Sequence, residues 1–169
     1  LVLPEDDFDS ALEQKIEIGV SNFEVLQALP EGIKVHIKVD TGLGRNGFAK
    51  SDWHKVFELA SSKKVVGIFT HLANTSEPED LKQRDLFDEA VTMAKQAGIS
   101  GFQTHLAASA AALSYPNFDY DMVRIGIALY GQNPFEDQEV SGIDLRPAMR
   151  AVAKTIGFKR VAAGHGVSY

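Results

Sequence analysis

The 169-residue sequence contains no cysteine. Disulfide bonds and thiolate metal sites are therefore excluded, and nothing points to an oxidising compartment. No apolar run approaches the roughly 20 residues that a membrane-spanning helix needs, and no stretch has the layout of a secretory signal peptide. From these absences we expect a cytoplasmic protein that has no membrane partner.

Basic residues are too few and too dispersed to bind a polyanion. Lys and Arg number 17 against 23 Asp and Glu, which gives a net charge of -6. A nucleic-acid partner is therefore not expected. The hydrophobic share of 44% and the mean hydropathy of -0.11 are ordinary for a globular protein with a packed core.

Short apolar runs alternate with amphipathic stretches along most of the chain. The runs predict six strands, at residues 1–3, 16–20, 33–39, 65–70, 102–106 and 122–125. The stretches between them predict helices at residues 7–15, 21–29, 51–61, 78–96 and 107–113. Expected helix boundaries are the N-caps Asp6 or Asp7, Ser21 and Ser51, a start at Pro78 or Glu79, and a stop at Gly98. Strands alternating with helices predict right-handed crossovers and a parallel sheet.

Six such units do not close the common eight-stranded barrel. We therefore expect an incomplete (β/α)8 TIM barrel that holds strands three to eight. After Asp144 the helical stripe is lost and strand-forming residues prevail. This change predicts a boundary near Ile143, with residues 1–144 as a partial barrel and 145–169 as the start of a β-rich C-terminal domain.

The two ends predict that the chain is an internal piece of a larger protein. It opens on an apolar run and stops without a polar tail, whereas domains usually begin and end in exposed polar segments. We expect the isolated piece to be unstable, because missing strands would leave exposed parallel edges.

Polar residues gather where the predicted strands end, and this is the end of a parallel barrel that carries chemistry. They are Lys38, Asp40 and Arg45 after one strand, His71 after the next, then His105 and Ser109, then Arg124 and Gly126. Singly, each is more often a solvated charge, a helix cap or a structural hydrogen-bonding group. Their shared edge predicts one site.

Two local motifs suggest other chemistry. Residues 42–47 fit G-x-G-x-x-G, but the next strand ends at Thr70 and His71 rather than at the acidic residue that a dinucleotide fold uses. Asp40, Thr41 and Gly42 match the aspartic-protease triplet, yet those enzymes need two such aspartates in an all-β fold. Both alternatives are therefore discounted.

Five segments resemble the alanine racemase family. The matching family patterns are K-x-D-T-G-M-x-R-x-G, T-H-x-A, H-x-A-N-S-A-A, D-x-V-R-P-G-I-A-L-Y-G and G-x-G-V-S-Y-G, at residues 38–47, 70–73, 105–111, 121–131 and 164–169. Ala108 departs from the family, which usually has Asn there. No segment resembles A-V-x-K-A-N-A-Y-G-H-G, the surroundings of the lysine that forms the Schiff base with the cofactor.

The resemblance implies an isomerase that uses pyridoxal 5'-phosphate to interconvert L-alanine and D-alanine, works as a homodimer and supplies D-alanine for cell-wall peptidoglycan. The cofactor would stabilise the carbanion formed at Cα, and one base on each face would move the proton. Because the Schiff-base lysine has no counterpart here, the chain alone is expected to be inactive. A non-catalytic cofactor carrier on the same barrel, or a purely structural βα domain, are the alternatives. The structural alternative predicts that Lys38, His71, Ser109 and Arg124 lie apart.

The resemblance also implies residue roles. Tyr169 would be the second base, acting in the partner's site. Arg124 would face the pyridine nitrogen and donate a hydrogen bond without protonating it, since guanidinium keeps its proton. His71 would pack on the ring. Ser109 and the backbone N–H groups of Gly126 and Ile127 would bind the phosphate. Arg45 would contact the phenolic oxygen of the cofactor and the substrate carboxylate. Lys38 would be a possible carbamate, with a plain Lys38–Asp40 surface pair as the alternative. No metal is implied.

Overall fold

The computed structural model describes residues 1–135 and 142–167. Within these ranges the strands are β1 (Ile18–Val20), β2 (Lys34–Lys38), β3 (Lys64–Phe69) and β4 (Gln103–His105). The α-helices are α1 (Phe8–Glu13), α2 (Phe23–Ala28), α3 (Trp53–Ala60), α4 (Glu77–Gln96) and α5 (Ser109–Ser114). Short 3-10 helices are η1 (Lys50–Asp52), η2 (Pro116–Phe118) and η3 (Ile127–Tyr130).

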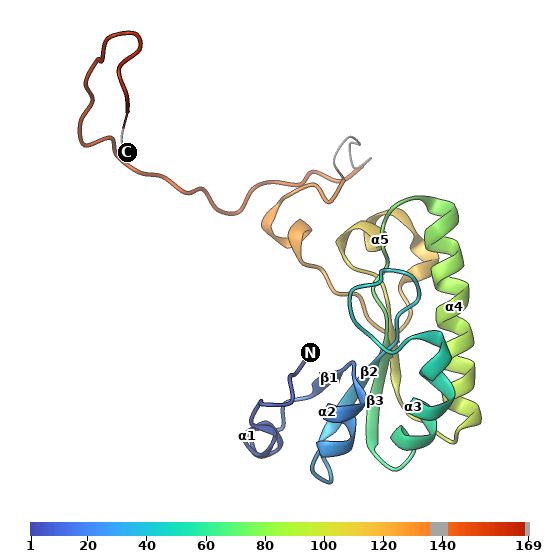
Figure 1. Ribbon diagram of the computed structural model, residues 1–169. Helices are drawn as coiled ribbons and strands as arrows, with labels where there is room; N and C mark the ends of the chain where they lie inside the picture. Colours follow the sequence, from blue (N-terminus) through green and yellow to red (C-terminus); the bar gives the residue numbers. More distant parts are fainter. Residues whose placement is uncertain (136–141, 168–169) are drawn as a thin grey trace.

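The four strands form one parallel sheet in the order β1-β2-β3-β4. Neighbours in the sheet are neighbours along the chain, and the helices between them lie on one face (Figure 1). This is the arrangement of consecutive units in a parallel barrel. The expected parallel α/β sheet is thus confirmed, and it is consistent with a partial barrel.

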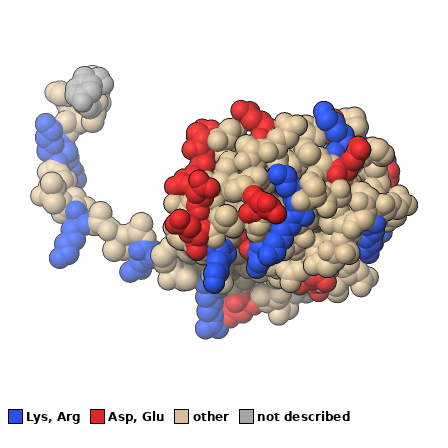
Figure 2. All heavy atoms as spheres, turned by 90° about the horizontal axis from the view of Figure 1, so that it is seen from below, with Lys and Arg blue, Asp and Glu red and all other residues tan. Residues whose placement is uncertain are grey.

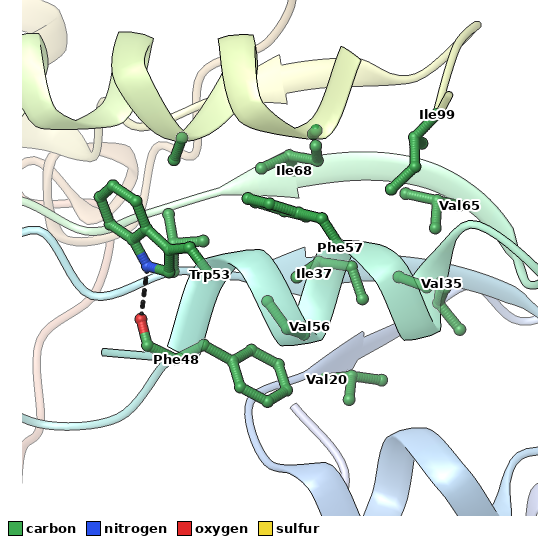
Figure 3. Close-up of a cluster of buried hydrophobic side chains, with 14 of the residues drawn as sticks. Val20, Val35, Ile37, Phe48, Trp53, Val56, Phe57, Val65, Ile68 and Ile99 are labelled. Carbon is green, nitrogen blue, oxygen red and sulfur yellow. Dashed lines mark hydrogen bonds between the residues drawn. The ribbon is translucent and has the colours of Figure 1, made fainter. Parts of the chain in front are cut away.

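One face of the sheet is closed by the helices. Val35 and Ile37 of β2 are fully buried, and Phe57 of α3 packs between them and the next strand (Figure 3). Trp53 is also fully buried, and its indole N–H donates to the carbonyl of Phe48 at 2.9 Å. A buried indole needs such a partner, and this bond ties the start of α3 to the loop that follows β2.

The opposite face of the sheet, which would line the inside of a barrel, is unusually polar. Every second residue of β2 is basic or imidazole: Lys34, His36 and Lys38. On the neighbouring strands Phe69 and His105 stack with ring centroids 4.7 Å apart. Because side chains alternate across a strand, one strand serves both the apolar core and this polar interior.

Two of the six predicted strands do not form. Residues 1–3 make a single backbone hydrogen bond to β1, from Val2 to Gly19, and Leu3 donates to the Asp6 carboxylate instead. A side chain therefore takes the N–H that a strand partner would need.

The predicted strand at residues 122–125 is reduced to one isolated bridge, between Ala108 and Arg124. The Asp121 carboxylate accepts the backbone N–H of Thr104, which a carbonyl of the next strand would otherwise take. Local side-chain acceptors compete with ladders in this way.

The predicted helices all exist, with shifted ends. Asp7 caps α1 as expected, whereas Asn22 rather than Ser21 caps α2. Ser51 does not cap α3, because residues 50–52 form η1 ahead of it. The long α4 begins at Glu77, and α5 begins two residues later than predicted, at Ser109.

Residues 142–167 contain no helix or strand and lead away from the sheet (Figure 1). Large apolar side chains such as Ile156 and Phe158 are almost fully exposed there. The expected β-rich domain at 145–169 is therefore not shown and stays a prediction.

Acidic and basic side chains intermingle over the body of the molecule (Figure 2). None of the helices in the described residues combines the length and apolar character that crossing a bilayer requires.

Candidate active site

A cavity of about 400 Å3 opens at the carboxyl ends of the strands. The resemblance gives roles to eight residues, and six of them line this cavity: Arg45, His71, Ser109, Arg124, Gly126 and Ile127. They come from four separate stretches of chain that the parallel sheet brings to one edge. The structural alternative, which requires these residues to be scattered, is contradicted for His71, Ser109 and Arg124.

Arg124 is the most heavily bonded side chain of the site. Its guanidinium donates to His105 Nδ1 at 2.7 Å and, from the other terminal nitrogen, to the carbonyls of Thr70 and Leu106 at 2.8 and 3.2 Å. The same nitrogen lies 3.3 Å from His71 Nδ1. Burial lowers its pKa to about 10, so Arg124 remains protonated at neutral pH and can only donate.

The two histidines beside Arg124 are held neutral. Burial is the main cause that lowers the pKa of His71 to about 4, and the charges of Arg124, Arg45 and Lys38 lower it further. Burial, then Arg124, then His36 bring the pKa of His105 to about 3. Each ring that faces Arg124 must therefore offer it an unprotonated nitrogen, because a guanidinium has no acceptor.

Ser109 begins α5 and lies under the turn that follows Arg124. Its hydroxyl oxygen accepts the backbone N–H of Gly126 at 3.0 Å and that of Ala128 at 3.3 Å. Ser109 is buried and Gly126 is exposed. A hydroxyl and backbone N–H groups thus converge on the cavity wall, and such groups are suited to phosphate oxygens.

Arg45 sits on a loop whose shape is set by backbone contacts. The Asp40 carboxylate accepts the N–H groups of Gly42 and Gly44, which is a turn that aspartate favours. At Gly47 (φ +115°) an added Cβ would lie 2.9 Å from backbone atoms of Val39 and Asp40. Only glycine permits this close approach, and the loop can then present Arg45 to the cavity.

Lys38 is buried, with 3% of its surface exposed, and does not line the cavity. Its amine donates to the side-chain carbonyl of Asn46 and lies 5.9 Å from the Phe69 ring centre. Burial lowers the pKa of this amine, and Arg45 and Arg124 lower it further, against an opposing effect of Asp40. The alternative of a plain Lys38–Asp40 surface pair is therefore wrong.

Residues 1–134 match the family model described as alanine racemase, N-terminal domain. The chain belongs to the alanine racemase family. It is 37% identical to the alanine racemase of Thermobifida fusca, over all of this chain and 49% of that protein. It is 39% identical to that of Beutenbergia cavernae, over 80% of this chain and 38% of the other.

The fold agrees with solved members of the family. The crystal structure of alanine racemase from Corynebacterium glutamicum superposes with a TM-score of 0.74 and 31% sequence identity, covering 87% of this chain and 43% of that one. Alanine racemase from Streptomyces coelicolor gives a TM-score of 0.72 at 30% identity, covering 79% and 39%. The chain spans about half the length of the curated relatives it matches.

Two sequence expectations within the family pattern have different outcomes. Ala108, where the family usually has Asn, lies in the cavity wall, so a methyl group occupies a position that usually offers an amide. Tyr169, the expected second base, lies outside the described residues, and its role stays a prediction.

Sequence reasoning missed several residues of the site. Ala128 rather than Ile127 shares the Ser109 hydroxyl with Gly126. His36 was assigned only to a strand, although a histidine between Lys34 and Lys38 on an inward-facing register was a signal that could have been used. Among the described residues no group of three or more His, Asp or Glu side chains is placed to hold a metal.

Proposed function

We propose that the protein containing this chain is an isomerase that interconverts L-alanine and D-alanine with pyridoxal 5'-phosphate, in the cytoplasm, and so supplies D-alanine for peptidoglycan. The observation that carries the proposal is the gathering of Arg45, His71, Ser109 and Arg124 around one cavity. These residues match the family motifs one by one. In this proposal residues 1–144 form part of the cofactor-binding barrel and 145–169 begin the C-terminal domain.

The donor set fits the cofactor. Ser109 and the backbone N–H groups of Gly126 and Ile127 would bind its phosphate, since hydroxyl and amide donors are the usual phosphate ligands. Arg124 would donate to its ring nitrogen, and His71 would lie against the ring. When bound, the cofactor delocalises the negative charge that develops at Cα of an amino acid.

Arg124 would bind the cofactor and would also limit how far the cofactor delocalises the negative charge from Cα. Its guanidinium stays charged at neutral pH, so it donates a hydrogen bond to the ring nitrogen but does not transfer its proton. A ring nitrogen that stays unprotonated withdraws electrons less strongly. We infer that this favours return of the proton to Cα over side reactions such as transamination.

Arg45 would bind the substrate. It is exposed on the loop rim and lines the cavity, where a guanidinium can pair with the carboxylate of alanine. Lys38 would orient Arg45 as a carbamate, which turns a cation into an anion. A buried amine whose pKa is lowered has more of the neutral form that reacts with carbon dioxide, and the Lys38 amine meets both conditions.

Proton transfer needs one base on each face of Cα. We assign one to Tyr169, reaching the site of a second copy in a homodimer. The other would be the cofactor-binding lysine of the family, and no segment of this sequence resembles its surroundings. We therefore expect the 169 residues alone to be inactive.

The test is alanine racemisation with added pyridoxal 5'-phosphate, followed by circular dichroism or chiral chromatography, on the 169-residue chain and on the full-length protein that contains it. Activity in the full-length protein alone is the expected result. Cofactor binding without racemisation there would favour the non-catalytic carrier. Absence of both cofactor binding and racemisation would reject the proposal. Activity in the short chain would show that the cofactor-binding lysine lies within these 169 residues after all.

A further inference from the structure

We propose that Glu17 and His36 are positioning residues, which hold Arg124 in the cavity through a chain of hydrogen bonds that passes through His105. The chain crosses the inner face of the sheet, from an exposed carboxylate before β1 to the guanidinium at the carboxyl edge. Its consequence for catalysis rests on the function proposed above, whereas its geometry does not.

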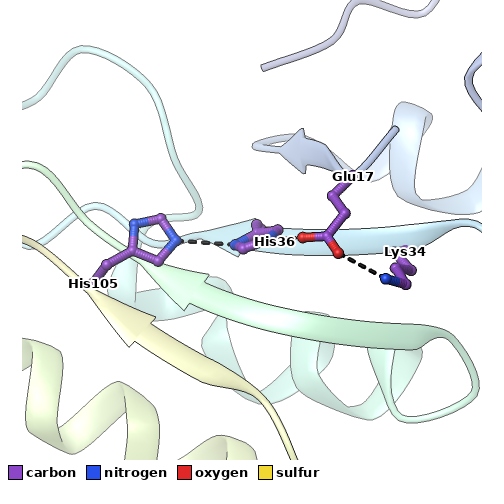
Figure 4. A network of polar contacts seen from close by, with 4 residues as sticks. All are labelled: Glu17, Lys34, His36 and His105. Atoms are coloured by element: carbon purple, nitrogen blue, oxygen red, sulfur yellow. Dashed lines mark hydrogen bonds and ion pairs between the residues drawn. The ribbon is translucent and has the colours of Figure 1, made fainter. Parts of the chain in front are cut away.

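The contacts are continuous from end to end. Glu17 Oε2 lies 3.1 Å from His36 Nε2, and His36 Nδ1 lies 2.9 Å from His105 Nε2 (Figure 4). His105 Nδ1 then lies 2.7 Å from the Arg124 guanidinium. Lys34 pairs with the other oxygen of Glu17 at 2.8 Å, so the carboxylate is itself held in place.

The two ends of the hydrogen-bond chain, Arg124 and Glu17, dictate the same direction for every proton. Arg124 can only donate, so His105 Nδ1 must accept and the proton of His105 is on Nε2. That proton points to His36, whose Nδ1 must accept it and whose own proton is then on Nε2. The Glu17 carboxylate, which can only accept, receives it, so all three hydrogen bonds are satisfied in one arrangement of tautomers.

The charge states suit this arrangement. His105 is 4% exposed, and its pKa is lowered to about 3, so its ring is neutral and offers one donor and one acceptor. Hydrogen bonds from Lys34 and then His36 lower the pKa of Glu17 and keep it an anion. A buried Nε2–H on His105 that lost its acceptor would be unsatisfied, which is costly in a protein interior.

The sheet makes room for this chain at a single glycine. A Cβ built on Gly67 of β3 would lie 1.9 Å from His36 Nδ1, which no side chain can tolerate. Glycine inside a strand weakens it and often marks a close approach by another group. Gly67 therefore permits the ring of His36 to cross β3 and reach His105 on β4.

The experiment uses the full-length protein and four variants. His36→Phe removes the acceptor while filling the space, and His36→Gln restores an acceptor. Gly67→Ala displaces the ring without altering any donor or acceptor. Lys82→Met is the matched control, since it breaks an exposed ion pair with Glu79 on α4 and touches no member of the hydrogen-bond chain.

Two readouts separate positioning from general damage. Nitrogen-15 NMR of the cofactor-free protein reports which nitrogen of His36 and His105 carries the proton. Racemisation kinetics and the dissociation constant of pyridoxal 5'-phosphate report the effect on Arg124. We expect both imidazoles to carry the proton on Nε2, and kcat/KM to fall about tenfold in His36→Phe and Gly67→Ala, as for a buried donor left without an acceptor. His36→Gln should recover most of the loss, and Lys82→Met should match the wild type.

Two outcomes overturn the proposal. One is a proton on Nδ1 of either imidazole, because the chain then runs in the wrong direction. The other is an equal loss in His36→Phe and His36→Gln, which would assign His36 a packing role alone. If the wild-type protein neither binds the cofactor nor racemises alanine, the proposed function fails. The NMR result still tests whether the hydrogen-bond chain exists in the proposed direction.

Discussion

The hydroxyl of Ser109 accepts the backbone N–H of Gly126 at 3.0 Å, which joins the start of α5 to the turn after Arg124. We expect Ser109→Ala to weaken binding of pyridoxal 5'-phosphate by about tenfold, since one hydrogen bond to a charged group contributes roughly 1.5–3 kcal/mol. A fluorescence titration of the cofactor measures this. Ser114→Ala, at the exposed end of the same helix, is the control, and an equal loss in both variants would contradict the assignment of Ser109.

Replacing Arg124 with lysine should impair the site even though the charge is kept. The guanidinium reaches His105 and the carbonyls of Thr70 and Leu106 together, and an ammonium lacks that planar fork. We expect Arg124→Lys to lower the free energy of unfolding by about 1–3 kcal/mol and racemisation by at least tenfold. Urea unfolding and kinetics are the measurements. Arg84, a half-buried arginine that pairs with Asp85 on α4, supplies the control, Arg84→Lys, and similar effects of both substitutions would refute this role.

Acid should destabilise the protein through His71. Its pKa is about 4 in the folded protein against 6.5 for the ordinary histidine, so below pH 6.5 the unfolded chain binds a proton that the folded chain does not. Stability is therefore complete above pH 6.5 and is lost as the pH falls toward 4, by up to about 1 kcal/mol per pH unit from this group.

Urea unfolding between pH 7 and pH 5 tests that slope. His71→Asn should reduce it by the share of this group, while His105, whose pKa is lowered to about 3, supplies the rest. His54→Gln, at an exposed position of α3, should leave it unchanged. A slope that His71→Asn does not alter would show that other groups cause the acid sensitivity.

Lys38 should carry a carbamate when carbon dioxide is present. The buried amine with a lowered pKa has the neutral form that forms this adduct, and the site around it is basic. We expect carbon-13 NMR with labelled bicarbonate to show a carbamate signal that Lys38→Gln removes. Lys50→Gln, at an exposed ion pair, should retain the signal, and a signal that survives in Lys38→Gln would place the carbamate elsewhere.

The loop that carries Arg45 should depend on one glycine more than on another. Gly47 and Gly44 both have positive φ, but an added Cβ meets backbone atoms at 2.9 Å only at Gly47, while Gly44 has open space. Gly44→Ala should cost about 1 kcal/mol of strain, and Gly47→Ala distinctly more, with a raised KM for alanine because Arg45 moves. Equal effects of the two substitutions would show that the close approach has no part in holding the loop.

Much of the fold could be predicted because its elements depend on local pattern. The alternation of apolar residues in β2 and the spacing of Trp53, Val56, Phe57 and Ala60 in α3 identify a strand and a helix that pack together. Residues 1–3 and 122–125 carry an equally apolar pattern and form no ladder. What decides them is competition for backbone groups by the Asp6 and Asp121 carboxylates, and composition alone does not reveal such contacts.

The site could be predicted where chemistry falls at strand ends, as it does for His71 and Arg124. Glu17 lies just before β1 and His36 lies in the middle of β2, away from the carboxyl ends at which the same rule predicts function. Their connection to Arg124 runs through a register in which His36 lies beside Gly67. Pairing registers between distant strands follow from the whole sheet, so the connection emerges only from the structure.

The bond from the Trp53 indole to the carbonyl of Phe48 has a practical consequence. Trp53 is the chain's single tryptophan, and its bond partner ends the loop that presents Arg45 to the cavity. Indole emission is sensitive to the loss of such a bond and to the entry of water. The chain therefore carries its own optical reporter, through which movement of that loop can be followed in real time without attaching a dye.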